Sequence, residues 1–250
     1  MIKFFRKIRQ NLLSEGKTGK YLKYAIGEII LVVIGILIAL SINNWNENRK
    51  TINTQEKYLI LLKKETDANR EELNRVLTRV DSTFKAQKYL ISNFMTLSEI
   101  ELDSVLQHAI GPQTRINFET SVLSELKITG QLKNITNDKL RKYLVGIEPY
   151  LIAAKEQEDR VIYQCDRARE VIVNNGNMAS IVYSAGVDIH KSFNQEASNL
   201  TLQNNSKFKN ILAVYLAETE VSMTRDYIKL EKHLNEINAM ISKELNNSKK

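Results

Sequence analysis

Histidine and cysteine are the residue types in this sequence that could bind a metal or act as nucleophiles. The three histidines, His108, His190 and His233, lie in separate parts of the chain, and none belongs to an H-E-x-x-H motif. None follows a glutamate by three residues, the spacing with which di-iron bundles bring two ligands onto one helix face. Cys165 is the only cysteine, so it cannot form an internal disulfide, and it falls on an apolar helix stripe. We therefore predict no catalytic, cofactor or metal site, and a buried structural thiol at Cys165.

Two acidic residues interrupt apolar helix stripes. Glu158 is the polar member of one stripe and Glu220 interrupts another. Glu158 could pair with Arg169 or Lys155, and the two acids could face each other or share an arginine. Such polar residues more often set the register of helices than perform chemistry. Four tyrosines could line a ligand pocket or pack half-buried between helices: Tyr143, Tyr150, Tyr163 and Tyr183. We do not expect an enzyme.

An apolar segment near the N-terminus determines where the rest of the chain is placed. The apolar run is unbroken from Ile29 to Leu40, and Tyr24 and Trp45 bracket it. At about 1.5 Å per helical residue these two aromatic residues lie roughly 31 Å apart, the thickness of a hydrocarbon core. Aromatic rings favour the two headgroup boundaries of a bilayer. We therefore predict a transmembrane helix over residues 21–46, anchored by Tyr24 and Trp45.

Two other interpretations of this segment remain open. A cleaved signal peptide also has a basic start and an apolar run, and Ala39-Leu40-Ser41 resembles a cleavage site, although the stretch before the run is long. A buried core helix is the other interpretation, because the strictly apolar run is shorter than the ~20 residues that a crossing needs. The aromatic brackets and the basic flank favour a membrane anchor.

Positive charge is concentrated ahead of the apolar segment. Residues 1–23 hold +6 of the net charge of +7, and residues 29–250 carry only +2 once Glu28 is counted. Lys and Arg in short flanks stay cytoplasmic. We therefore expect residues 1–20 to form a basic cytoplasmic arm, either amphipathic on the bilayer or disordered, and residues 47–250 to form a periplasmic domain of a bacterial inner-membrane protein. Nucleic-acid binding is not expected, because the large domain has little excess positive charge.

One face of the predicted membrane helix combines an acid with small residues. Glu28, Gly35 and Ala39 are separated by seven and four residues, which places them within about 20° of one another on a helix. Small residues let helices approach closely, and an acid in the apolar zone tends to face a partner or water. We interpret this face as a contact with a second copy of the chain or with another envelope membrane protein. Alternatively, Glu28 extends to the lipid headgroups.

Beyond the apolar segment, the sequence predicts an all-α domain. The chain has two prolines and nine glycines, and apolar residues recur at steps of three and four. Three long stripes predict helices over about 53–95, 138–173 and 207–246, which form an antiparallel bundle with short helices inserted between the first two. The Asn- and Ser-rich segment 174–206 is predicted to be a loop, either mobile or used for recognition. If the first long helix rises from the membrane and the second returns, this loop lies near the bilayer.

Several features of these helices can be predicted individually. The stripe of the second long helix continues across Pro149, which favours one kinked helix, with a break at Gly146 as the alternative. The stripe of the third passes through Leu216, Met223 and Tyr227. A short helix is expected to be capped by Asn117, and another opens with a capping box over residues 96–99.

Three segments carry a resemblance to a known family: YAIGEI (24–29), GILIAL (35–40) and NNWNE (43–47). They are similar to the N-terminal signature of a family of uncharacterised bacterial single-pass inner-membrane proteins, a domain-of-unknown-function family. Residues 118–143 resemble the middle block of that family more loosely. The resemblance implies an envelope protein with a helical periplasmic domain, and it supplies no activity, ligand or catalytic residue.

Two functions of different classes fit these predictions. We favour a non-enzymatic interaction or scaffold module of an envelope complex, anchored in the lipid bilayer. The alternative is a periplasmic sensor or ligand-binding bundle. A sensor would have to relay its signal through a membrane partner, because only about 23 residues precede the crossing.

Overall fold

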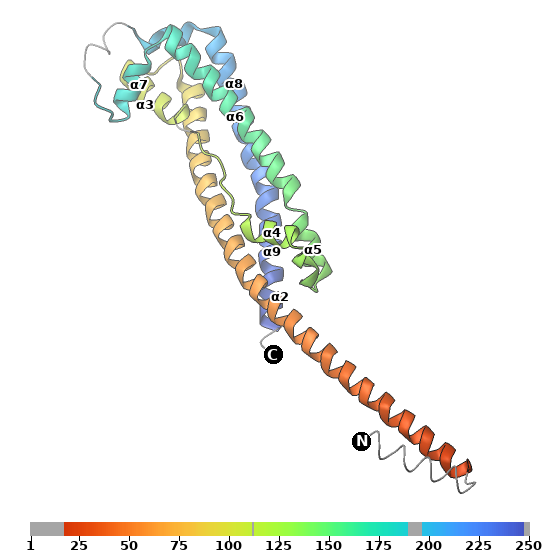
Figure 1. Cartoon of the computed structure of the whole chain (residues 1–250). Coiled ribbons are helices and arrows are strands. Elements are labelled where there is room, and N and C mark those ends of the chain that lie inside the picture. Colours follow the sequence, from red (N-terminus) through yellow and green to blue (C-terminus); the bar gives the residue numbers. More distant parts are fainter. Residues whose placement is uncertain (1–17, 112, 190–196, 248–250) are drawn as a thin grey trace. The chain divides into compact units, whose positions relative to one another are not determined.

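The computed structural model describes residues 18–111, 113–189 and 197–247, which are mostly helical and contain no strand (Figure 1). The chain divides into two compact units, Met1–Gln55 and Glu56–Lys250. The first helix, α2 (Thr18–Asn93), has residues in both units. The predicted arm, residues 1–20, lies outside the described residues except for its last three.

The second unit contains helices of very different lengths, and the all-α class is confirmed. After α2 the elements are α3 (Glu99–Ala109), α4 (Ser121–Ile128), the 3₁₀ helix η1 (Gln131–Asn134), α5 (Asp138–Val145), α6 (Glu148–Asn175), α7 (Met178–Ser184), the 3₁₀ helix η3 (Asn199–Asn204), α8 (Ser206–Val221), the π-helical segment η4 (Ser222–Tyr227) and α9 (Ile228–Asn247).

The predicted membrane helix and the first long helix of the bundle are one continuous helix. The sequence between residues 46 and 53 contains no glycine or proline, so nothing there ends a helix. Helical spacing also adds local bonds, because Lys50 Nζ lies 3.1 Å from Glu47 Oε1 and Thr51 Oγ1 donates to the Glu47 carbonyl at 3.0 Å.

The long helices of the second unit do not simply alternate in direction. α9 is antiparallel to α2: Asp67 of α2 accepts from Asn238, and Arg70, one turn later, donates to Asn235. α6 runs in the same direction as α2, because α3, an extended segment, α4 and α5 first return the chain (Figure 1). The expectation that the second long helix returns toward the start of the first was therefore wrong. The described residues of segment 174–206 lie at the Asn93 end of α2, where Gln203 Nε2 donates to the Leu97 carbonyl at 3.3 Å.

The second predicted long helix is two helices, as the alternative break at Gly146 proposed. α5 ends at Gly146, and α6 begins with Pro149 in its first turn. A proline there costs no hydrogen bond, because the first amides of a helix have no helical partner. A side chain at Gly146 would press on the Lys142 carbonyl, which lies 3.0 Å from the position of a Cβ.

The described residues of segment 174–206, which are 174–189 and 197–206, are not a loop throughout. The segment contains α7 and η3, and Asn199 joins them. The fully buried Asn199 amide donates to Asp103 Oδ1 at 2.6 Å and accepts from the Asn177 amide at 2.7 Å. A Cβ on Gly176 would clash with the Asn199 side-chain oxygen, so this close approach requires glycine.

A π-helical segment changes the phase of the third long helix. Downstream of it Tyr227 and Leu230 are buried, as predicted. Upstream of it the stripe was predicted to pass through Leu216, Glu220 and Met223. The buried residues are instead the ones just before them in the sequence, Tyr215, Thr219 and Ser222. The wider π turn of η4 accommodates one extra residue, which lets both halves of the helix face the core. The prediction that Glu220 lies on the buried stripe was therefore wrong, and its side chain is exposed.

The second unit has two apolar cores with a polar layer between them. The α7-side core combines α3, the end of α2, the second half of α6 and α8. The α5-side core combines the Leu59–Val76 part of α2 with α4, α5, the start of α6 and α9. Between them lie buried polar residues from all three long helices: Gln87, Gln157, Glu158, Thr219, Ser222 and Asp226.

The phase change predicts different effects for two single-residue deletions. Deleting the exposed Thr224 within η4 turns the π segment into regular α-helix and keeps both buried stripes in place, so we expect a small loss of stability. Deleting the exposed Lys232 rotates Leu234, Ile237 and Ile241 by about 100° relative to the core. Each displaced core side chain costs ~2–5 kcal/mol. Thermal unfolding followed by circular dichroism measures both, and equal losses would contradict the phase assignment.

Candidate functional site

The first candidate site is the apolar part of α2. Among the described residues, this is the one helix long and apolar enough to cross a membrane, with a mean hydropathy of 2.8 in its most apolar 18-residue window. Every residue from Ile29 to Leu40 is exposed. Apolar side chains exposed over this length require a lipid or protein environment.

The predicted contact face and anchors lie on this helix. Gly35 and Ala39 are exposed, and a Cβ on Gly35 would meet no atom within 4 Å. Glu28 is half-exposed on the same helix. Trp45 is 62% exposed, and the Arg49 guanidinium lies 5.0 Å from its ring centroid. A tryptophan with a cation one turn away is typical of a membrane boundary. Tyr24 is within α2, but its side chain is not among those described.

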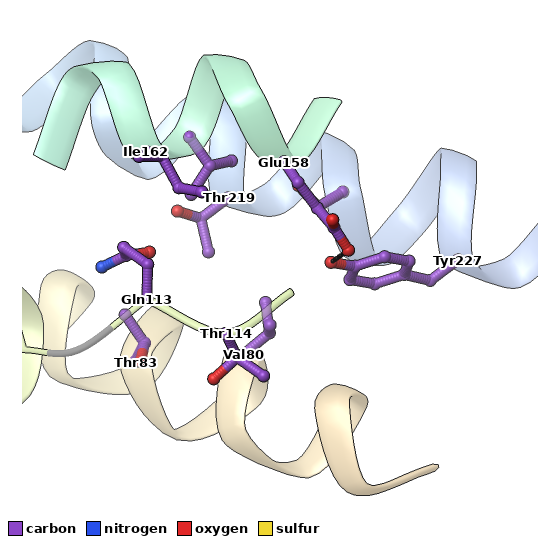
Figure 2. Close-up of a pocket in the computed structure, with 10 residues that line it drawn as sticks. Val80, Thr83, Gln113, Thr114, Glu158, Ile162, Thr219 and Tyr227 are labelled. Carbon is purple, nitrogen blue, oxygen red and sulfur yellow. Dashed lines mark hydrogen bonds between the residues drawn. The ribbon is translucent and has the colours of Figure 1, made fainter. Parts of the chain in front are cut away.

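The second candidate site is a cavity in the polar layer, shown in Figure 2. It measures about 20 Å³, which is room for about one water molecule. Side chains from α2, the extended segment, α6, α8 and η4 line it: Val80, Thr83, Gln113, Thr114, Glu158, Val161, Ile162, Thr219, Ser222 and Tyr227. A cavity of this size and polarity can hold water and protons, but no organic substrate.

Glu158 is the ionisable group of this cavity. Its Oε1 accepts from the Ile116 amide and from the Tyr227 hydroxyl, each at 3.0 Å. Burial raises the pKa of Glu158, and burial together with the nearby carboxylate raises the pKa of Tyr227. The structure does not bring Glu158 to either predicted cationic partner. Arg169 donates instead to the Gly111 and Ile110 carbonyls, and Lys155 is exposed.

Side chains of α2 and α6 hold the extended segment between α3 and α4. The amides of Ile116, Asn117 and Glu119 donate to Glu158, Glu72 and Asn69, and Asn69 Nδ2 returns a bond to the Glu119 carbonyl at 2.7 Å. These bonds replace the helix or strand partners that the segment lacks.

Glu65 continues this row of contacts at the N-terminus of α4. It accepts from the Val122 amide at 2.7 Å, the Leu123 amide at 3.3 Å and the Ser121 hydroxyl. Glu65 therefore satisfies amides that a helix N-terminus leaves free. Burial raises the pKa of Glu65, and these bonds oppose that effect. The predicted cap, Asn117, lies outside α4, which begins after Thr120.

Sequence analysis missed this row, although a signal was present. Glu65, Asn69 and Glu72 are spaced by four and three residues, so they share one face of α2, and Glu65 and Asn69 are buried. Buried polar residues at seam spacing indicate specific hydrogen-bond partners.

Cys165 is buried, as predicted. Gln113 Nε2 lies 3.2 Å from its sulfur, and burial raises the pKa of the thiol. A raised thiol pKa disfavours the nucleophilic thiolate. The Tyr215 hydroxyl also accepts from Gln113, so the thiol belongs to a polar contact at the end of α3.

The described histidines and the four predicted tyrosines do not gather into one ligand pocket, and His190 lies outside the described residues. His233 stacks between Tyr143 and Tyr150, with ring centroids 5.0 Å and 4.6 Å away, and its Nε2 lies 2.8 Å from the Tyr143 carbonyl. Tyr163 and Tyr183 are exposed. The described residues contain no group of three His, Cys, Asp or Glu side chains that could hold a metal ion.

The capping box of α3 lies two residues later than predicted. Ser98 is the N-cap, and Glu101 accepts from both its amide, at 2.9 Å, and its hydroxyl, at 2.7 Å. The acid of the predicted box, Glu99, accepts instead from the Asn199 amide at 2.7 Å. This acid therefore anchors η3 to the start of α3.

The role of Glu65 predicts a large difference between two acids of α2. Glu65→Ala leaves two amides and a hydroxyl without their acceptor in a buried position, so we expect a loss of about 2–4 kcal/mol in the free energy of unfolding. Glu71→Ala is the control, because this acid is exposed, and we expect a change within about 0.5 kcal/mol. Urea unfolding compares the two variants, and similar effects would contradict the proposed cap.

Comparison with known proteins gives a match to one family model over part of the chain and no activity. Residues 28–118 match a family described as "Family of unknown function (DUF6090)". The matched range includes Glu28, the apolar run, Trp45 and the row of polar residues on α2. No curated protein and no solved structure matches the chain. The expectation of an uncharacterised family is therefore confirmed, and the family that this chain matches is one of unknown function.

Proposed function

We propose that this chain is a single-pass inner-membrane protein of a bacterial envelope, and that its helical domain, residues 47–250, is a periplasmic, non-enzymatic interaction module. The exposed apolar stretch of α2 carries the proposal, because it is long and apolar enough to serve as a membrane anchor. The matched family adds no activity.

The distribution of charge supports the orientation. Residues 1–23 hold nearly all of the excess positive charge, and basic flanks of this length stay in the cytoplasm. The other flank of the apolar stretch has less excess positive charge. Arg49 lies next to Trp45, and the adjacent Lys50 is paired with Glu47.

An alkaline phosphatase fused after Lys250 tests this orientation. We expect an active enzyme, because phosphatase folds in the oxidising periplasm, and we expect a fusion to a cytoplasm-requiring reporter to be inactive. A fusion truncated before Ile29 is the control that stays in the cytoplasm. Activity of only the cytoplasmic reporter after Lys250 would contradict the proposed orientation.

The internal use of polar groups supports an interaction module over an enzyme. The buried acids Glu65, Asp103 and Glu158 all accept hydrogen bonds from amides or hydroxyls of the chain itself. They therefore serve the fold. Gly35 and Ala39 are exposed and form a face of small residues on α2, and such faces let a second membrane helix approach closely.

A second candidate function, a periplasmic ligand-binding sensor, is favoured by one groove. The groove lies among α3, α6 and α7 and measures about 380 Å³, within the range of small-molecule sites. Apolar side chains form most of it, including Leu106, Ile172 and Ile181.

Affinity capture of the full chain from detergent-solubilised membranes tests the interaction module. We expect a second copy or another membrane protein to co-purify in stoichiometric amount, and the double variant Glu28→Gln/Gly35→Leu to reduce its yield several-fold, because it removes the acid and blocks close approach. Ile30→Leu, an apolar exchange on the same helix, is the control.

Two outcomes would contradict the interaction module. One is an unchanged yield from the double variant, which would remove the contact face. The other is a monomer whose melting temperature rises with an apolar small molecule, which would favour the sensor.

A further inference from the structure

Glu158 is a buried acid without a cation. The residue is 5% exposed, and it forms no ion pair with the described part of the chain. Arg115 is the cation that acts on it through space, but the Arg115 guanidinium is bonded to Asp159 at 2.8 Å. Burying an ionised carboxylate in such a place is costly, and a bound proton removes that cost.

The two oxygens of Glu158 have different surroundings. Oε1 accepts both hydrogen bonds, from the Ile116 amide and the Tyr227 hydroxyl, and Figure 2 shows the latter. Oε2 has no hydrogen bond to a described residue. Glu158 lines the water-sized cavity, together with the hydroxyls of Thr83, Thr114, Thr219 and Ser222.

A neutral carboxylic acid satisfies both environments at once. Its carbonyl oxygen still accepts the two bonds that Oε1 receives, and a proton on Oε2 can donate to a hydroxyl or a water in the cavity. We propose that Glu158 is a proton-binding site that carries its proton at neutral pH and thereby joins the extended segment to the π-helical segment η4.

The charged groups around this site leave Glu158 without a direct counter-ion. From the extended segment comes Arg115, which Asp159 neutralises, and from η4 come Tyr227 and Asp226, the latter bonded to Arg225 at 2.8 Å. α2 and α8 contribute only neutral side chains to the cavity: Val80, Thr83 and Thr219. The nearest complete charges therefore cancel in pairs, and the proton is left as the neutralising charge.

The consequence for stability has a definite sign. Burial raises the pKa of Glu158 in the folded chain, so the folded state binds the proton more tightly than the unfolded state. Proton binding at Glu158 therefore adds to the free energy of unfolding. This contribution is fully present below the pKa that Glu158 has in the unfolded chain, and it is lost as the pH rises through the pKa of Glu158 in the folded chain. At higher pH the carboxylate carries a buried charge, and the cost of burying that charge lowers the stability of the folded chain.

The test compares two glutamine variants of the full chain in detergent micelles, from about pH 4 to about pH 9. Glu158→Gln mimics the neutral acid, because its amide both accepts and donates. We expect its melting temperature to exceed that of the wild type by an amount that grows with pH. The control Glu156→Gln changes an exposed acid of the same helix and should give no pH-dependent difference.

Three outcomes would overturn the proposal. The first is a Glu158→Gln variant that fails to fold, or whose melting temperature falls further below the wild type as the pH rises. The second is a pair of infrared spectra at neutral pH that do not differ in the carboxylic-acid C=O region. The proposal requires such a band in the wild type and its loss in Glu158→Gln. The third is a wild-type stability that depends on Na⁺ against K⁺ at constant ionic strength, which would show a bound cation in place of the proton.

Discussion

The fold of the second unit depends on satisfying the backbone amides of residues 116–123. These residues leave α3 in extended form and enter α4, so they have no strand partner and few helical ones. An amide buried without an acceptor costs about 1–3 kcal/mol, and the hydrogen bonds of the Ile116, Glu119, Val122 and Leu123 amides are partly or fully buried. Glu65, Asn69 and Glu72 of α2, together with Glu158 of α6, supply the acceptors. The segment can therefore return the chain between α2 and α6, which is why these two helices run in the same direction.

The same requirement explains the polar layer between the two cores. Glu158 holds the extended segment on one side and Tyr227 of the π-helical segment on the other. The π segment lets the third helix change phase at this level, so that α8 faces one core and α9 faces the other. Buried polar residues specify a unique register more strongly than apolar packing does. This layer therefore aligns three long helices whose apolar stripes alone would permit sliding.

Much of this architecture could be predicted from sequence, because long apolar stripes and an exposed apolar run are strong local signals. Most of the predicted stripe of α6 is buried, including Ala154, Cys165, Ala168 and Ile172. What escaped prediction depends on partners distant in the chain. The one-residue phase change at η4 moves the buried position from Glu220 to Thr219, and periodicity alone does not show a π turn. The cap of α4 is Glu65, 56 residues before Ser121. Of the candidate sites, the face formed by Glu28, Gly35 and Ala39 could be predicted from the spacing of these residues on one helix. The cavity at Glu158 could not be predicted, because it forms only when three helices pack in the right register.

Amide hydrogen exchange of the extended segment tests the central claim most directly, because an amide exchanges slowly only when a hydrogen bond protects it. In the full chain in detergent micelles, we expect the amides of Ile116, Glu119 and Val122 to exchange as slowly as those of α6. Glu65→Ala should accelerate exchange at Val122 and Leu123 first. Rapid exchange of all these amides in the wild type, at the rate of an unstructured loop, would contradict the account.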